Sequence, residues 1–171
     1  MNKERCITLS LIILAAAASR LLPHPANVTP IAAIALFAGA QFERKSYAFL
    51  IPLAAMLLSD LFLGFHPTQW AVYLGFALVT CIGFKLRNHI MPGAVALATL
   101  CGSAVFFVIS NLGVWLTGGL YPLTTEGLVT CFVAAIPFFT NNLMGDAFYA
   151  TLLFAGFALA EKQWYTLKAT A

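Results

Sequence analysis

The chain alternates long apolar stretches with short polar segments. A membrane helix needs about 20 consecutive apolar residues. Six stretches approach or exceed this length, at residues 6–22, 26–42, 46–64, 69–86, 91–117 and 136–160. The second stretch gives the weakest prediction, because its uninterrupted apolar part begins only at Pro30. We therefore expect an all-α membrane bundle of six transmembrane helices that forms a single domain over residues 1–171.

Proline residues mark several ends of these segments. Pro23 and Pro25 end the first segment, because proline lacks the amide hydrogen that a helix interior needs. Pro92 fits the first turn of the fifth segment, where that hydrogen would be unpaired anyway. The apolar residues 124–135 follow a loop and precede Pro137, so we expect a short helix at the outer surface and then a bend. In the alternative, Pro137 kinks one long helix.

Basic residues orient the predicted bundle, because cytoplasmic loops collect Lys and Arg. With six crossings, one side holds both termini and the second and fourth loops, with Lys3, Arg5, Arg44, Lys45, Lys85, Arg87, Lys162 and Lys168. The other side holds only Arg20. We expect a multi-pass protein of the bacterial inner membrane with both termini in the cytoplasm. A cleaved signal peptide is the alternative for the first segment, since small residues follow its basic start and apolar run.

Composition supports the membrane prediction and narrows the class of protein. The chain is 61% hydrophobic and 9% charged, whereas a soluble domain is about 25% charged. The net charge of +3 comes without a basic stripe, so we expect no nucleic-acid partner. The four cysteines lie in apolar stretches without the spacing of a zinc site or a disulfide framework, and we expect no cofactor.

Polar residues gather toward the expected outer face. They lie at outer helix ends and in outer loops, and they are Arg20, His24, Asn27, Asp60, His66, Gln69, Trp70, Ser110, Asn111, Trp115, Tyr121 and Glu126. The inner half of the bundle is nearly free of ionisable groups. This asymmetry predicts a polar cavity that opens outward and is closed below by apolar packing. A free channel would instead carry polar groups through its whole depth.

The last apolar segment carries the deepest polar residues. Asn142, Asp146 and Tyr149 are spaced i, i+4 and i+7, so they share one helical face. Asp146 lies roughly 15 Å below the start of this segment, near the bilayer midplane. An ionised carboxylate there costs at least about 2.5–3.5 kcal/mol, so a partner, a ligand or a proton must offset it. The candidate solute-binding residues are Arg20, Asn27, Asp60, His66, Trp70, Asn111, Trp115, Asn142, Asp146 and Tyr149.

Several of these residues also have structural interpretations. Arg20 and Asp60 lie at similar depths and could form an ion pair, and Asn111 and Asn142 could link helices by hydrogen bonds. The tryptophans Trp70 and Trp115 and the loop residue Tyr121 also fit interface anchors. His24, His66 and Asp60 together form a weak candidate for a metal site.

Ala15 and Ser19 form a small-xxx-small pair within an alanine run of the first segment. Such pairs let membrane helices approach each other closely. We expect this pair either to dock a partner membrane protein or to pack inside the bundle.

Four stretches of the chain resemble a known family. They are SRLLPHPANVTPIAAIALFAGA from Ser19, LLSDLFLGFHP from Leu57, SNLGVWLTGGLYPLT from Ser110 and AAIPFFTNNLMGDAFYATLLF from Ala134. They resemble a family of small bacterial membrane proteins of unknown function for which a transport activity is expected. The resemblance runs through nearly the whole chain and implies a membrane transport protein.

The chain is also remotely similar to the substrate-binding S components of energy-coupling factor (ECF) transporters. The similarity rests on size, six expected spans, internal termini and a polar outer face. It implies capture of a small molecule from outside and docking, through Ala15 and Ser19, on a transmembrane coupling subunit driven by ATPases. Alanine is usual at both positions, so Ser19 departs from the pattern. The chain has no GxxxxGK[ST] loop, so ATP would be used by partners.

These observations leave three functional hypotheses. The first is a solute-binding transport subunit, in which Asn111, Asn142, Asp146 and Tyr149 hydrogen-bond the solute. The second is an intramembrane enzyme that acts on a lipid-like substrate. The absence of an HExxH or GxSxG motif argues against it. The third is a structural subunit of a membrane complex, in which the polar residues hold helices together.

Overall fold

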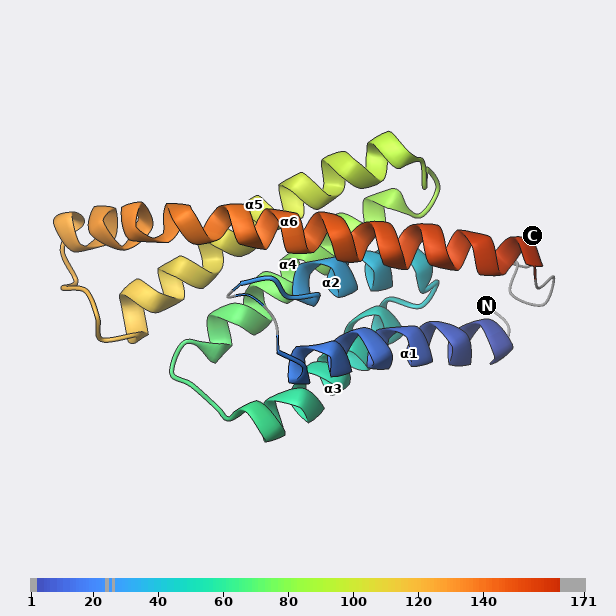
Figure 1. The fold of residues 1–171 in the computed structure, drawn as a ribbon, viewed down its shortest axis with the longest axis horizontal. Helices are drawn as coiled ribbons and strands as arrows, with labels where there is room; N and C mark the ends of the chain where they lie inside the picture. The colour runs from blue at the N-terminus through green and yellow to red at the C-terminus, as the bar shows by residue number, and fades with distance from the viewer. Residues whose placement is uncertain (1–2, 24, 26, 164–171) are drawn as a thin grey trace.

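The chain is almost entirely helical over residues 3–23, 25 and 27–163, which its computed structural model describes. This part forms six α-helices, labelled in Figure 1, and one short 3-10 helix, η1. The bounds are α1 Lys3–Ala18, η1 Ser19–Leu21, α2 Ile31–Gln41, α3 Lys45–Leu63, α4 Gln69–Leu86, α5 Pro92–Thr117 and α6 Thr125–Gln163. The predicted all-α bundle is confirmed. His24 and Lys168 lie outside the described residues.

Four of the described helices, α3 to α6, are long and apolar enough to cross a membrane. Helix α1 with η1 reaches about 30 Å, the thickness of the hydrocarbon layer. The predicted helix over 26–42 is too long, because α2 has 11 residues and spans only about 16 Å. A helix that continued back through Pro30 would place its ring against the preceding turn, so α2 begins after it. The six expected crossings therefore stay a prediction.

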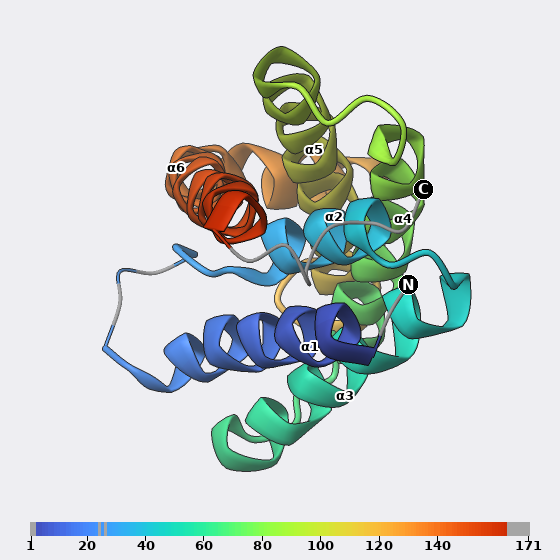
Figure 2. The ribbon, with the colours of Figure 1, turned by 90° about the vertical axis from the view of Figure 1, so that its right-hand side faces the viewer.

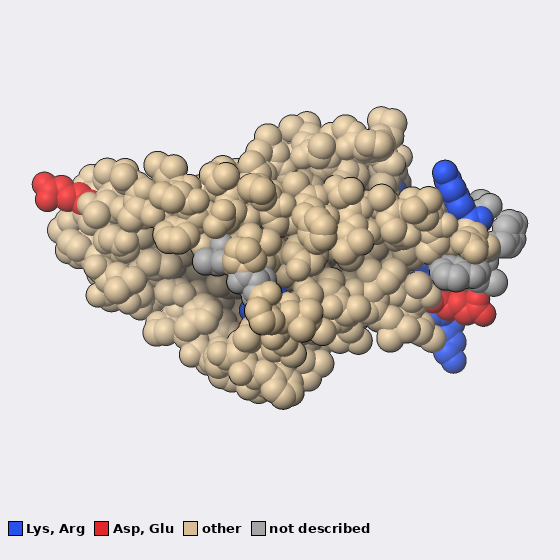
Figure 3. All heavy atoms as spheres, viewed as in Figure 1, with Lys and Arg blue, Asp and Glu red and all other residues tan. Residues whose placement is uncertain are grey.

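Successive helices run in opposite directions along the long axis of the molecule (Figure 1), so α1 begins and α6 ends at the same end. We call this the basic end, because all described Lys and Arg except Arg20 belong to segments that meet there: Lys3, Arg5, Arg44, Lys45, Lys85, Arg87 and Lys162. Figure 3 shows charged side chains at this end, an acidic side chain at the opposite tip and an almost uninterrupted uncharged surface between them. This distribution suits a protein whose middle lies in hydrocarbon.

Helix α2 lies at the centre of the bundle, between α4, α5 and α6 on one side and α1 and α3 on the other (Figure 2). All of its residues are buried. At its crossing with α4, a Cβ added to Gly39 would lie 2.2 Å from the Thr80 carbonyl oxygen. A Cβ on Gly83 would lie 2.4 Å from the Leu36 carbonyl oxygen. The two backbones therefore touch, as small residues allow in membrane helices.

The predicted separate helix over 124–135 is wrong, because these residues form the first turns of the continuous helix α6. The Thr124 hydroxyl caps this helix by accepting a hydrogen bond from the Gly127 N–H at 3.1 Å. Phe107 of α5 packs on Phe132 and on Phe139, which lie on either side of Pro137. Packing on one residue holds both parts of α6 in line, so the proline does not end the helix.

We predict that Gly83→Ala destabilises the bundle by roughly 1–3 kcal/mol, the usual cost of overpacking. The added methyl group would collide with the backbone of α2. Gly156→Ala is the matched control, because a Cβ there would meet nothing within 4 Å. Thermal unfolding of the purified variants in detergent measures the difference. Equal melting temperatures for Gly83→Ala and the wild type would contradict the close crossing.

Candidate functional site

The deepest polar cluster joins α5 and α6 inside the bundle. Asp146 of α6 is only 1% exposed. Its Oδ2 atom lies 2.7 Å from Ser103 Oγ and accepts a hydrogen bond from Asn142 Nδ2 at 2.9 Å. Ser103 Oγ also lies 3.0 Å from the Thr99 carbonyl oxygen. We call Ser103, Asn142 and Asp146 the Asp146 cluster.

The first turns of α2 lie beside the Asp146 cluster. With Asp146 they line a small void, closed by α4 and α5, that is too small for a water molecule; its other lining residues are Ala32, Ala33, Leu36, Val79, Thr99 and Gly102. The non-helical chain that leads into α2 passes at the same level, because a Cβ on Gly145 would lie 3.0 Å from Val28 Cα. No side chain caps α2 at Pro30. The helix thus begins inside the bundle, next to a buried carboxyl group.

The Asp146 cluster contains no compensating positive charge. Among the residues that the structure describes, no basic side chain forms an ion pair with Asp146. Its hydrogen-bonding partners, Ser103 and Asn142, are neutral. Burying an unpaired carboxylate is costly, and ionisable groups inside membrane bundles mark solute, ion or proton sites. The cluster can therefore hold a proton or a hydrogen-bonding solute.

Arg20 and Asp60 form a second cluster, which joins η1, α3 and α4. Arg20 Nη2 lies 2.8 Å from Asp60 Oδ1, and Arg20 Nη1 donates to Ser59 Oγ. The other carboxylate oxygen, Oδ2, accepts hydrogen bonds from Gln69 Nε2 at 2.6 Å and from the Tyr73 hydroxyl at 2.7 Å. Both oxygens of Asp60 are thus engaged within the protein. This geometry favours the structural interpretation of the pair.

The candidates Trp70, Trp115 and Asn111 form hydrogen bonds outside the two clusters. Trp70 Nε1 donates to Thr117 Oγ1 at 3.1 Å, and Trp115 Nε1 donates to the Pro122 carbonyl oxygen at 3.0 Å. The Asn111 amide donates back to the carbonyl oxygen of Phe107 in the same helix at 2.8 Å. These contacts do not join the candidates to either cluster.

Three further candidates also lie apart from the clusters. The Tyr149 hydroxyl lies 3.1 Å from Ser19 Oγ, between α6 and the end of α1. Asn27 is exposed in a loop with a positive φ of 63°. His66 Nδ1 lies 2.8 Å from Thr68 Oγ1, and Asp60 is bound to Arg20. The third predicted metal ligand, His24, lies outside the described residues, and these contain no group of three His, Cys, Asp or Glu side chains that could hold a metal ion. The hydrogen bonds and the ion pair thus divide the ten predicted residues among separate groups.

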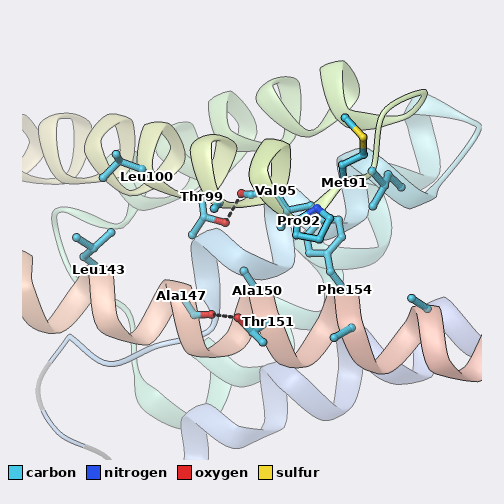
Figure 4. A pocket seen from close by; sticks show the side chains of 14 residues that line it. Met91, Pro92, Val95, Thr99, Leu100, Leu143, Ala147, Ala150, Thr151 and Phe154 are labelled. Carbon is cyan, nitrogen blue, oxygen red and sulfur yellow. Dashed lines mark hydrogen bonds between the residues drawn. The ribbon is translucent and has the colours of Figure 1, made fainter.

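The larger hollows are apolar and lie along α6. A groove of about 370 Å³ separates the first half of α5 from the second half of α6 (Figure 4). Pro92, Val95 and Phe154 are among its walls. The hydroxyls of Thr99 and Thr151 are turned to carbonyl oxygens of their own helices, both at 2.8 Å, as the dashed lines in Figure 4 show. This groove presents almost no free polar group.

A second groove, of about 390 Å³, lies between α1 and α6. The predicted docking pair, Ala15 and Ser19, lines it opposite Tyr149, Leu153 and Gly156. Ala15 is exposed, so it does not serve internal packing. The pair therefore lies on a surface that is open to the bilayer or to a partner.

Sequence reasoning missed several partners in the clusters. Ser103 lies four residues after Thr99 on an otherwise apolar face, which is a signal for a buried polar position. Tyr73 lies one helical turn after Gln69, a spacing that could have joined it to Asp60. A further set of contacts at the basic end, which joins Arg5 to Glu161 and Gln41, left no local signal because its members are distant in sequence.

A comparison with known families places the chain. Residues 1–169 match the profile of a family of unknown function, DUF6580. The chain belongs to this family. Searches of curated proteins and of solved structures gave no match. Membership of DUF6580 confirms the expected family of unknown function and supplies no activity, so the function must be argued from the clusters.

We predict that Arg20→Met alone destabilises the protein by about 3–5 kcal/mol, because it leaves a buried carboxylate without its counter-charge. Adding Asp60→Asn should restore part of this loss, since the unpaired charge is then removed. A double-mutant cycle of unfolding free energies measures the coupling. Strictly additive effects of the two substitutions would contradict the ion pair as a structural tie.

Proposed function

We propose that this DUF6580 protein is a membrane transport protein that binds a small solute beside Asp146, in the part of the bundle reached from the end opposite the basic end. The observation that carries the proposal is an interruption of helical structure, in which the non-helical residues 27–30 precede the short helix α2 beside Asp146. Helix α2 spans about half of the hydrocarbon thickness. The chain that leads into it places Val28 against Gly145, next to the buried Asp146.

Such an interruption is costly unless it has a use. Unpaired backbone groups cost several kcal/mol in hydrocarbon, so irregular backbone at this depth is surrounded by protein or lines a cavity. Transporters use discontinuous helices in this way, with the N-terminus of a half-helix facing the solute. Helix α2 has these features, because it starts without a side-chain cap and its first turn lines the void beside Asp146.

The Asp146 cluster supplies a small set of groups that can recognise a solute. Asp146, Asn142 and Ser103 together offer a carboxyl, an amide and a hydroxyl group. The adjoining void is too small for a solute in this conformation. Binding therefore requires the segment before α2 to move away from α6, which opens a path from the end opposite the basic end.

The basic end is the side that we propose for the cytoplasm, in agreement with the positive-inside rule. The resemblance to S components extends the proposal to a coupling subunit with ATPases as the energy source. The groove between α1 and α6, lined by Ala15 and Ser19, is the surface that we propose for its docking. The bilayer covers the remaining exposed apolar side chains.

We predict that reporter domains fused to either terminus lie in the cytoplasm, whereas one inserted after Gly119 lies outside. The reason is the position of the basic residues that the structure describes, all but Arg20 at one end. Activity of a periplasm-dependent reporter and fluorescence of a cytoplasm-dependent one measure the sides. A cytoplasmic signal at Gly119 would contradict the proposed orientation.

We predict that native mass spectrometry of the gently purified protein shows a retained small molecule, and that Asp146→Ala abolishes its retention. The substitution removes the carboxyl group to which Ser103 and Asn142 are directed. Glu126→Ala is the matched control, because Glu126 is an exposed carboxylate at the start of the same helix.

The melting temperature of each variant separates lost binding from lost folding. A folded Asp146→Ala protein that retains the molecule as well as the wild type would contradict the assignment of this site. Loss of the molecule in Glu126→Ala as well would show that the effect is not specific to Asp146.

A further inference from the structure

The hydroxyl group of Ser103 has more acceptors than it has hydrogens. Its Oγ lies 3.0 Å from the Thr99 carbonyl oxygen and 2.7 Å from Asp146 Oδ2. A hydroxyl carries a single donor hydrogen. Serine in a helix commonly directs this hydrogen to the carbonyl oxygen four residues earlier. When it does so here, the contact between Ser103 and Asp146 is a hydrogen bond only if the carboxyl group of Asp146 donates.

The elements around Asp146 present no other charge to balance a carboxylate. The residues that line the adjoining void are untitratable: Ala32, Ala33 and Leu36 from α2, Val79 from α4, and Thr99 and Gly102 from α5. On α6 itself the nearest titratable side chain along the chain is Tyr149, whose hydroxyl lies against Ser19. Arg20 is engaged by Asp60. A charge on Asp146 would therefore stand alone among the described residues.

The space beside Asp146 also limits what can bind there in this conformation. The void does not admit a water molecule, so a metal cation with its oxygen ligands does not fit. A proton needs no such space. The partial positive charge at the start of α2 lowers the cost of the carboxylate when the proton has left. Both protonation states of Asp146 are therefore accessible.

From this geometry we propose that Asp146 binds and releases a proton, and that the protonated cluster is the form that binds the solute. The second part rests on the proposed function. On release, the O–H bond of the carboxyl group breaks, its electron pair stays on the carboxylate oxygen, and the proton passes to water that enters when the segment before α2 moves away from α6. The Ser103 hydrogen then turns from the Thr99 carbonyl oxygen to Asp146 Oδ2, which keeps the carboxylate hydrogen-bonded.

Infrared spectroscopy of the protein in lipid nanodiscs tests the proton site without any solute. The wild type at neutral pH should show the carbonyl stretch of a protonated carboxyl group, and this band should fade reversibly as the pH rises. Asp146→Asn should lose the band, and Glu126→Gln should keep it. Absence of the band from the wild type, or its persistence in Asp146→Asn, would overturn the proposal.

Solute retention separates this proposal from the proposed function. By native mass spectrometry, retention by the wild type should fall as the pH rises, whereas Asp146→Asn, which imitates the protonated form, should retain the molecule at every pH. Retention that does not depend on pH in the wild type would overturn the proton coupling and leave the transport proposal standing. An infrared band without any retained molecule would leave the proton site standing and remove the solute function.

Discussion

The backbone of the segment that leads into and forms α2 imposes the main constraint on this protein. Residues 27–30 are not helical and α2 is short, so their polar backbone groups must be enclosed by protein if they lie in hydrocarbon. The bundle meets most of this demand, because Pro30 and every residue of α2 are buried and Val28 and Thr29 are half-buried, whereas Asn27 is exposed. Helix α4 can cover α2 closely only because Gly39 and Gly83 remove the side chains from their crossing. The fold is therefore organised around its least regular segment.

Polar ties at both ends of α1 hold the outer layer of the bundle to this centre. Arg5 binds Glu161 and Gln41 at the basic end and stacks on Phe157 at 4.9 Å. At the other end Arg20 binds Asp60. Between these ties, α1 faces α6 across the groove that contains Ala15 and Ser19. The contacts Arg5–Glu161 and Ser19–Tyr149 join the two walls of this groove, so movement of α1 would change it.

Hydropathy and loop charges were sufficient to predict the helical bundle, because apolar length and basic loops act locally along the chain. They overestimated the length of the second helix. Pro30 can end a helix inside the bundle only where neighbouring helices enclose the chain before it, and this is a long-range property. They divided α6 at Pro137, since the packing of Phe107 on both sides of the proline is a long-range contact. The polar site likewise had a part that depends on local spacing and a part that depends on long-range packing. The spacing of Asn142 and Asp146 was readable in sequence, but the separation of Asp60 from Asp146 was not, because it depends on which helices pack together.

The buried acidic groups differ in what neutralises them, and this difference is the reason for proposing Asp146 as the functional group. Arg5 and Glu161 neutralise each other, as do Arg20 and Asp60. Such pairs hold helices together, and removing one partner is far more costly than removing both. Asp146 is as deeply buried as any of them and has only neutral donors within the described residues. A structural role would be served by an asparagine at this position, which avoids the cost of a charge. A buried carboxyl group without a counter-charge is stabilised by a proton, and it can serve a function by exchanging that proton. This is the physical reason to propose Asp146 as the centre of the site.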